Sequence, residues 1–162
     1  MKKAFLLVIA SLGFGITVIA QEVSENAIGL RIGDRDGFGT EISYQRALGG
    51  NNRLEADFGW RSGNNFDGFK LTGIYQWVWA FDGNFNWYTG VGGGVGFYSL
   101  KNNAVDNETF VFTSGNIGIE YNFDSPWLFC LDFRPELGLG DFRDGFDITV
   151  DFDIALGLRY QF

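Results

Sequence analysis

The last fifteen residues of the chain, 148–162, alternate between large apolar side chains at even positions and polar or small residues at odd positions. A period of two over this length excludes a helix and predicts a β-strand with one apolar and one polar face. The strand is longer than the ~5 or 6 residues usual in soluble proteins, and it ends on the aromatic Phe162. Such a strand is typical of a β-barrel that crosses a membrane.

The N-terminus has the pattern of a secretory signal peptide. Lys2 and Lys3 precede an apolar run from Ala4 to Ile19, and Ala20 provides the small residue that precedes a cleavage site. An uncleaved membrane anchor is the alternative, but polar residues and glycines weaken a run that is shorter than the ~20 apolar residues needed to span a bilayer. We therefore predict a signal peptide over residues 1–20 and one barrel domain over residues 21–162.

Charge and composition exclude several classes of function. Removal of Lys2 and Lys3 with the signal would leave 10 basic and 20 acidic side chains, a net charge of −10, which disfavours nucleic acid as a partner. Histidine is absent, which removes the commonest general base and the commonest transition-metal ligand. Cys130 is the single cysteine, so no internal disulfide is expected. We predict a protein that is not an enzyme and has no cofactor.

Alternation of apolar and polar residues predicts eight strands in the mature chain. Tight turns with Gly-Gly, Asp-Gly and Ser-Pro sequences alternate with longer polar loops, as in an up-and-down barrel with both termini in the periplasm. The predicted fold is an all-β, eight-stranded antiparallel transmembrane barrel. Its strands are expected at residues 26–33, 38–48, 53–62, 68–80, 85–99, 109–123, 127–139 and 147–162.

Alternation alone does not say which face lies outside, because a soluble ligand-binding barrel would place its apolar face inward. The fifth predicted strand has glycines at Gly90, Gly92, Gly94 and Gly96 on its polar face. Glycines on a solvated outer face would weaken the strand, whereas inside a narrow barrel they make room for long charged side chains from other strands. This favours charges inside and apolar residues toward lipid.

Aromatic residues are predicted to form two girdles on the apolar face, at the level of the lipid headgroups. Three Asp-Gly-Phe sequences place Phe38, Phe69 and Phe146 where strands return from the longer loops. The girdle near the tight turns is expected to contain Trp79, Phe81, Phe85, Trp87, Tyr121, Phe123, Trp127, Tyr160 and Phe162.

The combination of signal, eight two-faced strands, short turns and a final Leu158-Arg159-Tyr160-Gln161-Phe162 resembles the small OmpA-like and OmpX-like outer-membrane barrels. The resemblance covers the whole mature chain and is one of pattern. It implies that the last strand is recognised by the outer-membrane assembly machinery, through Ile154, Leu156, Leu158, Tyr160 and Phe162. The polar loops are longer than the tight turns, but they are short compared with those of a receptor-like or adhesive member. This disfavours a role carried by the loops.

Alternation assigns charged side chains of both signs to the lumen. Because an eight-stranded barrel is just wide enough for side chains to fill it, these charges should pair and form a plug. A narrow ion-conducting path is the alternative, in which breaking an Arg-carboxylate pair raises conductance. The predicted lumen charges are Arg31, Glu41, Arg53, Glu55, Asp57, Arg61, Lys70, Glu120, Asp132, Arg134, Glu136, Asp151, Asp153 and Arg159.

Other groups of residues give little support for catalysis or ligand binding. Asp151 and Asp153 share a face, but no substrate cleft for a glycosidase-like pair is indicated. The glycine run 90–96 lacks the spacing of a nucleotide-binding loop, and Cys130 is expected to be a packed, inert thiol on the lumen side. Weak Ca²⁺ binding is an open alternative for the loop carboxylates, which are Asp34, Asp36, Asp67, Asp141 and Asp144.

The sequence thus predicts a monomeric, non-enzymatic barrel in the outer membrane that contacts membrane lipid and the assembly machinery and has a structural or surface-interaction role. A narrow porin-like channel and a soluble periplasmic ligand-binding barrel are the alternatives.

Overall fold

The computed structural model describes residues 23–33, 39–62, 66–100, 107–139 and 148–162, and these form eight strands. All eight predicted strands are present, with boundaries that differ by two residues or fewer. The strands are β1 (Asn26–Ile32), β2 (Thr40–Gly49), β3 (Asn52–Ser62), β4 (Phe66–Asp82), β5 (Phe85–Leu100), β6 (Asn107–Asn122), β7 (Trp127–Leu139) and β8 (Ile148–Gln161).

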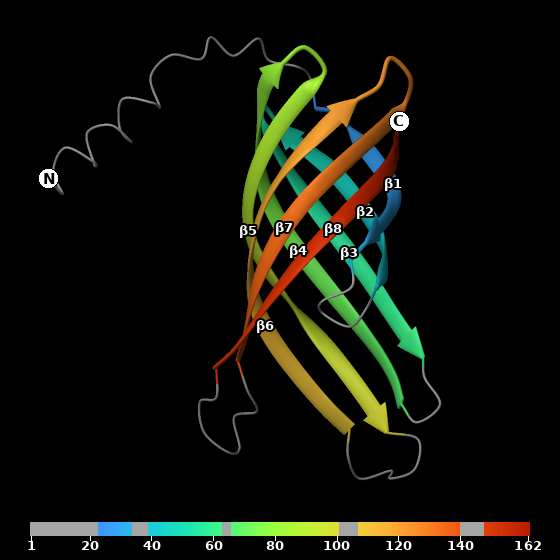
Figure 1. The fold of residues 1–162 in the computed structure, drawn as a ribbon, viewed down its shortest axis with the longest axis vertical. Coiled ribbons are helices and arrows are strands. Elements are labelled where there is room, and N and C mark those ends of the chain that lie inside the picture. Colours follow the sequence, from blue (N-terminus) through green and yellow to red (C-terminus); the bar gives the residue numbers. More distant parts are fainter. Residues whose placement is uncertain (1–22, 34–38, 63–65, 101–106, 140–147) are drawn as a thin grey trace, which may run out of the picture.

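The strands form a closed antiparallel barrel in which each strand pairs with the next and β8 pairs with β1. Figure 1 shows the C-terminus at the end that carries the short turns, which we name the turn end; the opposite end is the loop end. Gly49, Gly50 and Gly83 in two of these turns have φ of 101°, 58° and 52°. The predicted Gly-Gly and Asp-Gly turns therefore use the positive φ that glycine tolerates.

Strand pairing is staggered around the barrel. From Leu30, the paired residues lead through β2 to β7 and reach β8 at Ile148, whereas Leu30 itself pairs directly with Leu158, ten residues away. A stagger of this kind tilts the strands relative to the barrel axis. It also decides which inward side chains share one level of the lumen.

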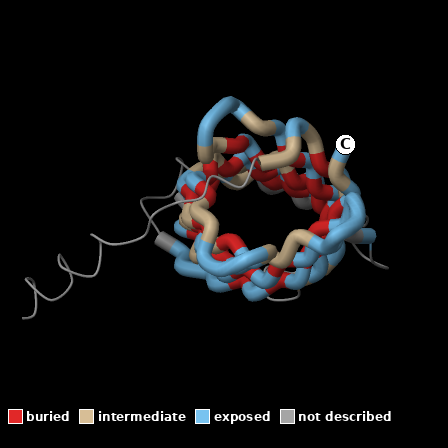
Figure 2. The backbone as a smooth tube through the Cα atoms, turned by 90° about the horizontal axis from the view of Figure 1, so that it is seen from above, coloured by how far each residue is buried: buried red, intermediate tan, exposed pale blue. Residues whose placement is uncertain are grey.

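The apolar faces of the strands lie outside and the polar faces inside. Figure 2, a view along the barrel, shows buried and exposed residues interleaved along the strands of the wall. Trp77, Phe133 and Ile154 are 36%, 37% and 58% exposed, while Arg134 and Asp153 are 0% and 1% exposed. A soluble ligand-binding barrel needs the opposite arrangement. No helix among the described residues is long and apolar enough to cross a bilayer.

Aromatic rings gather on the outer surface toward the turn end. The rings of Trp79 and Trp87 are stacked with centroids 4.4 Å apart, and those of Trp127 and Tyr160 meet edge to face at 5.4 Å. Near the loop end Phe69 stacks on Phe97 at 4.7 Å. Every residue predicted for the turn-side girdle faces outward, whereas Phe38 and Phe146 lie outside the described residues.

The glycines of β5 face the lumen as predicted, but they make room for different side chains than expected. A Cβ on Gly96 would overlap the ring of Phe110, and one on Gly94 would meet the ring of Phe112 at 2.6 Å. The expectation that these glycines accommodate charged side chains is therefore wrong at these positions. The rings fill the lumen there because Phe112, at 2% exposed, points inward.

The wall of the barrel is uneven where it closes. β8 pairs with β7 from Ile148 onward, but it pairs with β1 only from Leu156 onward, because β1 has 7 residues and ends at Ile32. Asp151 lies in the part of β8 beyond that pairing. It is exposed, and its carboxylate accepts a 2.9 Å hydrogen bond from the N–H of Phe152. The prediction that Asp151 is one of the buried lumen charges is thus wrong, although its position in β8 follows the inward-facing alternation.

Candidate functional site in the barrel lumen

Twelve of the fourteen predicted lumen charges are buried inside the barrel. Seven of the eight strands contribute at least one of them, and β5 contributes glycines and Tyr88 instead. Asp151 is exposed, and the side chain of Arg61 lies outside the described part of the structure. The twelve are Arg31, Glu41, Arg53, Glu55, Asp57, Lys70, Glu120, Asp132, Arg134, Glu136, Asp153 and Arg159.

Arg134 is the centre of the largest group of ion pairs. Its Nη2 atom lies 2.9 Å from Glu55 and 2.6 Å from Asp57, and its Nη1 atom lies 3.5 Å from Glu41. Arg159 donates to Glu55 at 2.9 Å from the other side. One guanidinium thus serves three carboxylates in a fully buried position, where an unpaired carboxylate would be costly.

Arg31 connects this group to two more carboxylates. Its guanidinium lies 2.9 Å from Glu41, 2.7 Å from Asp132 and 2.7 Å from Asp153. Because Glu41 contacts both Arg31 and Arg134, the pairs are continuous across the barrel. We name this set the central network: Arg31, Glu41, Glu55, Asp57, Asp132, Arg134, Asp153 and Arg159.

Two further ion pairs flank the central network. Toward the turn end, Arg53 lies 2.7 Å from Glu120 and donates to Gln76 at 2.6 Å, and its guanidinium lies 4.9 Å from the ring centroid of Tyr88. Toward the loop end, Lys70 lies 2.8 Å from Glu136. The lumen is therefore filled with paired charge over much of its length.

The turn end of the lumen has a different lining, which the sequence did not lead us to expect. Val78, Tyr88, Leu128 and Cys130 are each 3% exposed or less and pack together, and Val23 packs against them. We name Val78, Tyr88, Leu128 and Cys130 the turn-side apolar cluster. Apolar residues on the polar face of β4, β5 and β7 were the available signal, but they are outnumbered there by charges and glycines.

Cys130 faces the lumen and is buried, as predicted. Its sulfur accepts a hydrogen bond from Nη1 of Arg159 at 2.8 Å, so this residue links the turn-side apolar cluster to the central network. Packed between a guanidinium and apolar side chains, it has no access to solvent.

The remaining predicted sites are dispersed. Asp153 is buried against Arg31 while Asp151 is exposed, so the two carboxylates do not share a cleft. Asp67 accepts a 2.6 Å hydrogen bond from Ser62, and no metal-binding group of acidic, His and Cys side chains occurs among the described residues. The other four loop carboxylates, Asp34, Asp36, Asp141 and Asp144, lie outside the described residues.

The predicted assembly residues form a row on the outer face of β8. Ile154, Leu156, Leu158, Tyr160 and Phe162 are between 43% and 63% exposed. The backbone of Phe162 exchanges hydrogen bonds with Asn26 at 3.1 and 2.9 Å, so the last residue completes the closure of the barrel.

Solved structures with the same fold include several small outer-membrane barrels. The N-terminal barrel domain of OprF from Pseudomonas aeruginosa matches with a TM-score of 0.67 and 12% identity over 87% of this chain and 100% of that one. Neisserial surface protein A matches at 0.59, with 11% identity over 85% and 94%. Ail, the attachment invasion locus protein of Yersinia pestis, matches at 0.56, with 15% identity over 86% and 97%.

No protein-family model matches the sequence, and a search of curated proteins finds no match. At these identities the structural likeness establishes the fold: the chain is a closed, eight-stranded, up-and-down barrel, the fold that these small outer-membrane barrels share.

Proposed function

We propose that this chain, which has the fold of the small outer-membrane β-barrels, is a monomeric integral protein of the bacterial outer membrane with a structural or surface-interaction role and no enzymatic activity. Residues 1–20 act as its export signal, both termini of the mature chain lie in the periplasm, and the outward row on β8 is recognised during assembly.

The observation that carries this proposal is the distribution of side chains, which is the opposite of that in a soluble protein: apolar residues face outward and charged residues face inward. Among the described residues, thirty-two large apolar side chains are exposed on the outside, while twelve charged ones are buried inside. Contact with water over so large an apolar surface would be unfavourable, whereas lipid tails solvate it. A closed barrel also leaves few unpaired backbone groups facing hydrocarbon.

Fractionation tests the location. We expect the protein in the outer-membrane fraction, with faster gel migration before boiling than after it because the closed barrel resists detergent. A chain released by osmotic shock that migrates identically in both conditions would contradict the proposal.

The five tryptophans provide a sharper test, because all of them face outward: Trp60, Trp77, Trp79, Trp87 and Trp127. We expect strong quenching of their fluorescence by brominated lipids in reconstituted vesicles, and little quenching by acrylamide in the aqueous phase. Refolding with ordinary lipid of the same headgroup is the control. Quenching by acrylamide but not by brominated lipid would place the apolar face away from the bilayer.

The names of two structural neighbours support a surface-interaction role, since one is a surface protein and the other an attachment protein. This role predicts that a deletion strain loses binding to a host or abiotic surface while its envelope resists detergent normally. A purely structural role predicts the reverse pattern, so the two measurements separate them.

The second candidate is a narrow cation-preferring channel. It is favoured by the excess of acids in the described lumen, where seven carboxylates face five cationic side chains. Planar-bilayer recordings of the refolded protein test it. A lumen plugged by ion pairs predicts no discrete channel openings in these recordings, whereas cation-selective current steps would favour the channel.

A further inference from the structure

The lumen has two barriers of different chemistry, and the one at the turn end involves a segment outside the strands. Val78 of β4, Tyr88 of β5, and Leu128 and Cys130 of β7 converge on one level near the turn end. Further along the lumen, ion pairs fill much of the space, together with the rings of Phe110 and Phe112. An apolar layer across a narrow passage excludes water and ions without any charge.

Val23 covers this layer. It precedes β1 and packs against the turn-side apolar cluster. Its segment leads into β1, and main-chain hydrogen bonds at its end continue the pairing of β1 along the wall: Glu25 accepts from the N–H of Ala47 at 2.9 Å, and Asn26 donates to Phe162 at 3.1 Å. The segment is therefore anchored to β2 on one side and to the chain end beside β8 on the other.

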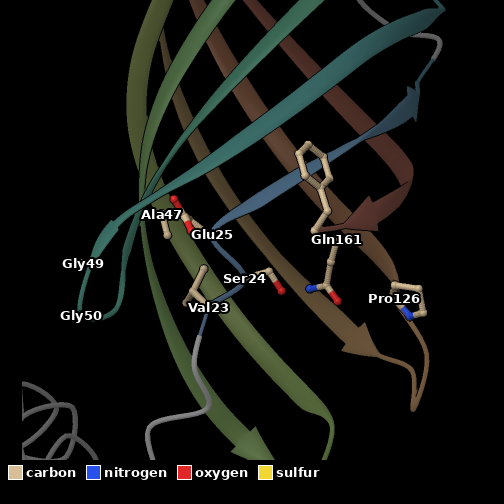
Figure 3. A pocket seen from close by; sticks show the side chains of 9 residues that line it. Val23, Ser24, Glu25, Ala47, Gly49, Gly50, Pro126 and Gln161 are labelled. Carbon is tan, nitrogen blue, oxygen red and sulfur yellow. The ribbon is translucent and has the colours of Figure 1, made fainter.

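What remains of the mouth is a recess of about 710 Å³. Figure 3 shows Val23 and Ser24 on the segment that leads into β1, between Gly49–Gly50 on one side and Pro126 on the other. Val23, Ser24 and Glu25 line this recess, and Val23 also packs against the turn-side apolar cluster, so the segment lies between the recess and the cluster.

We propose that Val23–Glu25 is a stopper that closes the turn-side mouth of the barrel, with Val23 as its sealing side chain. This closure lies on the turn-end side of the central network, to which Cys130 connects the turn-side apolar cluster through its hydrogen bond from Arg159. The lumen is consequently sealed from the turn end even where the ion pairs of the centre rearrange, and opening it from that end requires displacement of the stopper.

The chain contains its own reporter for this seal. Cys130 is the only cysteine in the sequence, and its side chain is buried directly in the cluster that Val23 covers. A water-soluble thiol reagent reaches Cys130 from the turn end only after Val23 has moved. The central network lies between Cys130 and the loop end and blocks the other route.

The experiment compares labelling rates of Cys130 by a small cationic methanethiosulfonate in the folded, micelle-bound protein. We expect slow labelling in the wild type and labelling roughly tenfold faster or more in Val23→Gly, because local opening governs access to a buried thiol. Ser24→Gly is the matched control: it loosens the same segment without removing a side chain from the apolar contact, and it should label at the wild-type rate.

Two further variants show whether loss of the Val23 side chain is the cause of faster labelling. Val23→Leu retains an apolar side chain and should label slowly, and Lys70→Met, which disrupts the loop-side pair, should leave the rate unchanged. Heat-modifiable migration confirms that each variant is folded. Wild-type labelling in folded Val23→Gly, or equal acceleration by Ser24→Gly or Lys70→Met, would overturn the stopper.

Discussion

The central network and the turn-side apolar cluster occupy neighbouring levels of one lumen, yet they fill it with opposite kinds of side chain. In the centre, Arg134 and Arg31 together contact five carboxylates. At the turn end, Val78 and Leu128 pack with Tyr88 and Cys130. Both regions are almost completely buried. They differ in how burial is stabilised: by ion pairs in the centre and by apolar packing at the turn end.

Ion-pair networks and apolar clusters differ in how they respond to mutation. A buried ion-pair network stabilises the fold only while all its members are present, because removal of one partner leaves the others charged and unpaired in an interior without water. An apolar cluster loses contacts in proportion to the atoms removed. The two regions should therefore respond differently to truncation of a single side chain.

The largest effect is expected from Arg134→Met. Loss of the guanidinium leaves Glu55, Asp57 and Glu41 with fewer cations, and breaking a buried ion pair typically costs about 3–5 kcal/mol. Equilibrium denaturant titration of the vesicle-bound barrel measures the free energy of unfolding. Combining Arg134→Met with Asp57→Asn should recover part of the loss, because one stranded carboxylate is neutralised.

A change below ~1 kcal/mol for Arg134→Met would show that the network is more solvated than its burial indicates. In that case the contrast between the centre and the turn end would disappear.

The sequence predicted which face each of these residues occupies but not which residues meet. Alternation assigns Arg31 and Asp132 to the lumen, yet they are 101 positions apart and come together only through the closure of β8 onto β1. That meeting depends on the ten-residue stagger, which no local pattern specifies. Asp151 shows the same limit, since its parity is correct and only the short β1 leaves it exposed.

The apolar part of the lumen was missed for a related reason. Tyr88 and Phe112 lie on polar faces of their strands, and their inward position follows from glycines on neighbouring strands: Gly118 lies beside Tyr88 and Gly94 beside Phe112. The glycine pattern indicated that space was needed inside. It did not indicate that aromatic rings would fill it.

Leu128→Ala tests the turn end and should have the second largest effect. The side chain is 1% exposed within the turn-side apolar cluster, and truncating a buried leucine costs about 2–5 kcal/mol, with the low end expected beside the mouth. Leu128→Met, which nearly conserves the volume, is the control and should cost less than ~1.5 kcal/mol. If both variants lose equal stability, the role of Leu128 is not one of packing.

The boundary between the two regions is tested by Gly157→Ala. A Cβ at Gly157 would overlap the sulfur of Cys130 and lie 2.9 Å from Nη1 of Arg159, so it presses on both regions at once. Overpacking of this kind costs about 1–3 kcal/mol. Adding Cys130→Ala removes the sulfur and should restore much of the stability. Failure of that rescue would show that Arg159 alone limits the space.

The smallest effect is expected from Arg46→Ala, because this substitution removes a guanidinium that lies outside the lumen. Arg46 lies 3.0 Å from Glu25 at the turn-end rim, but the two side chains are 49% and 71% exposed. Water and salt screen such a pair, so its loss should change the free energy of unfolding by less than ~1 kcal/mol, and by still less at high salt. Denaturant titration at two salt concentrations, beside Arg134→Met, measures the contrast directly. An Arg46→Ala loss as large as that of Arg134→Met would mean that burial is not what makes the central arginine important.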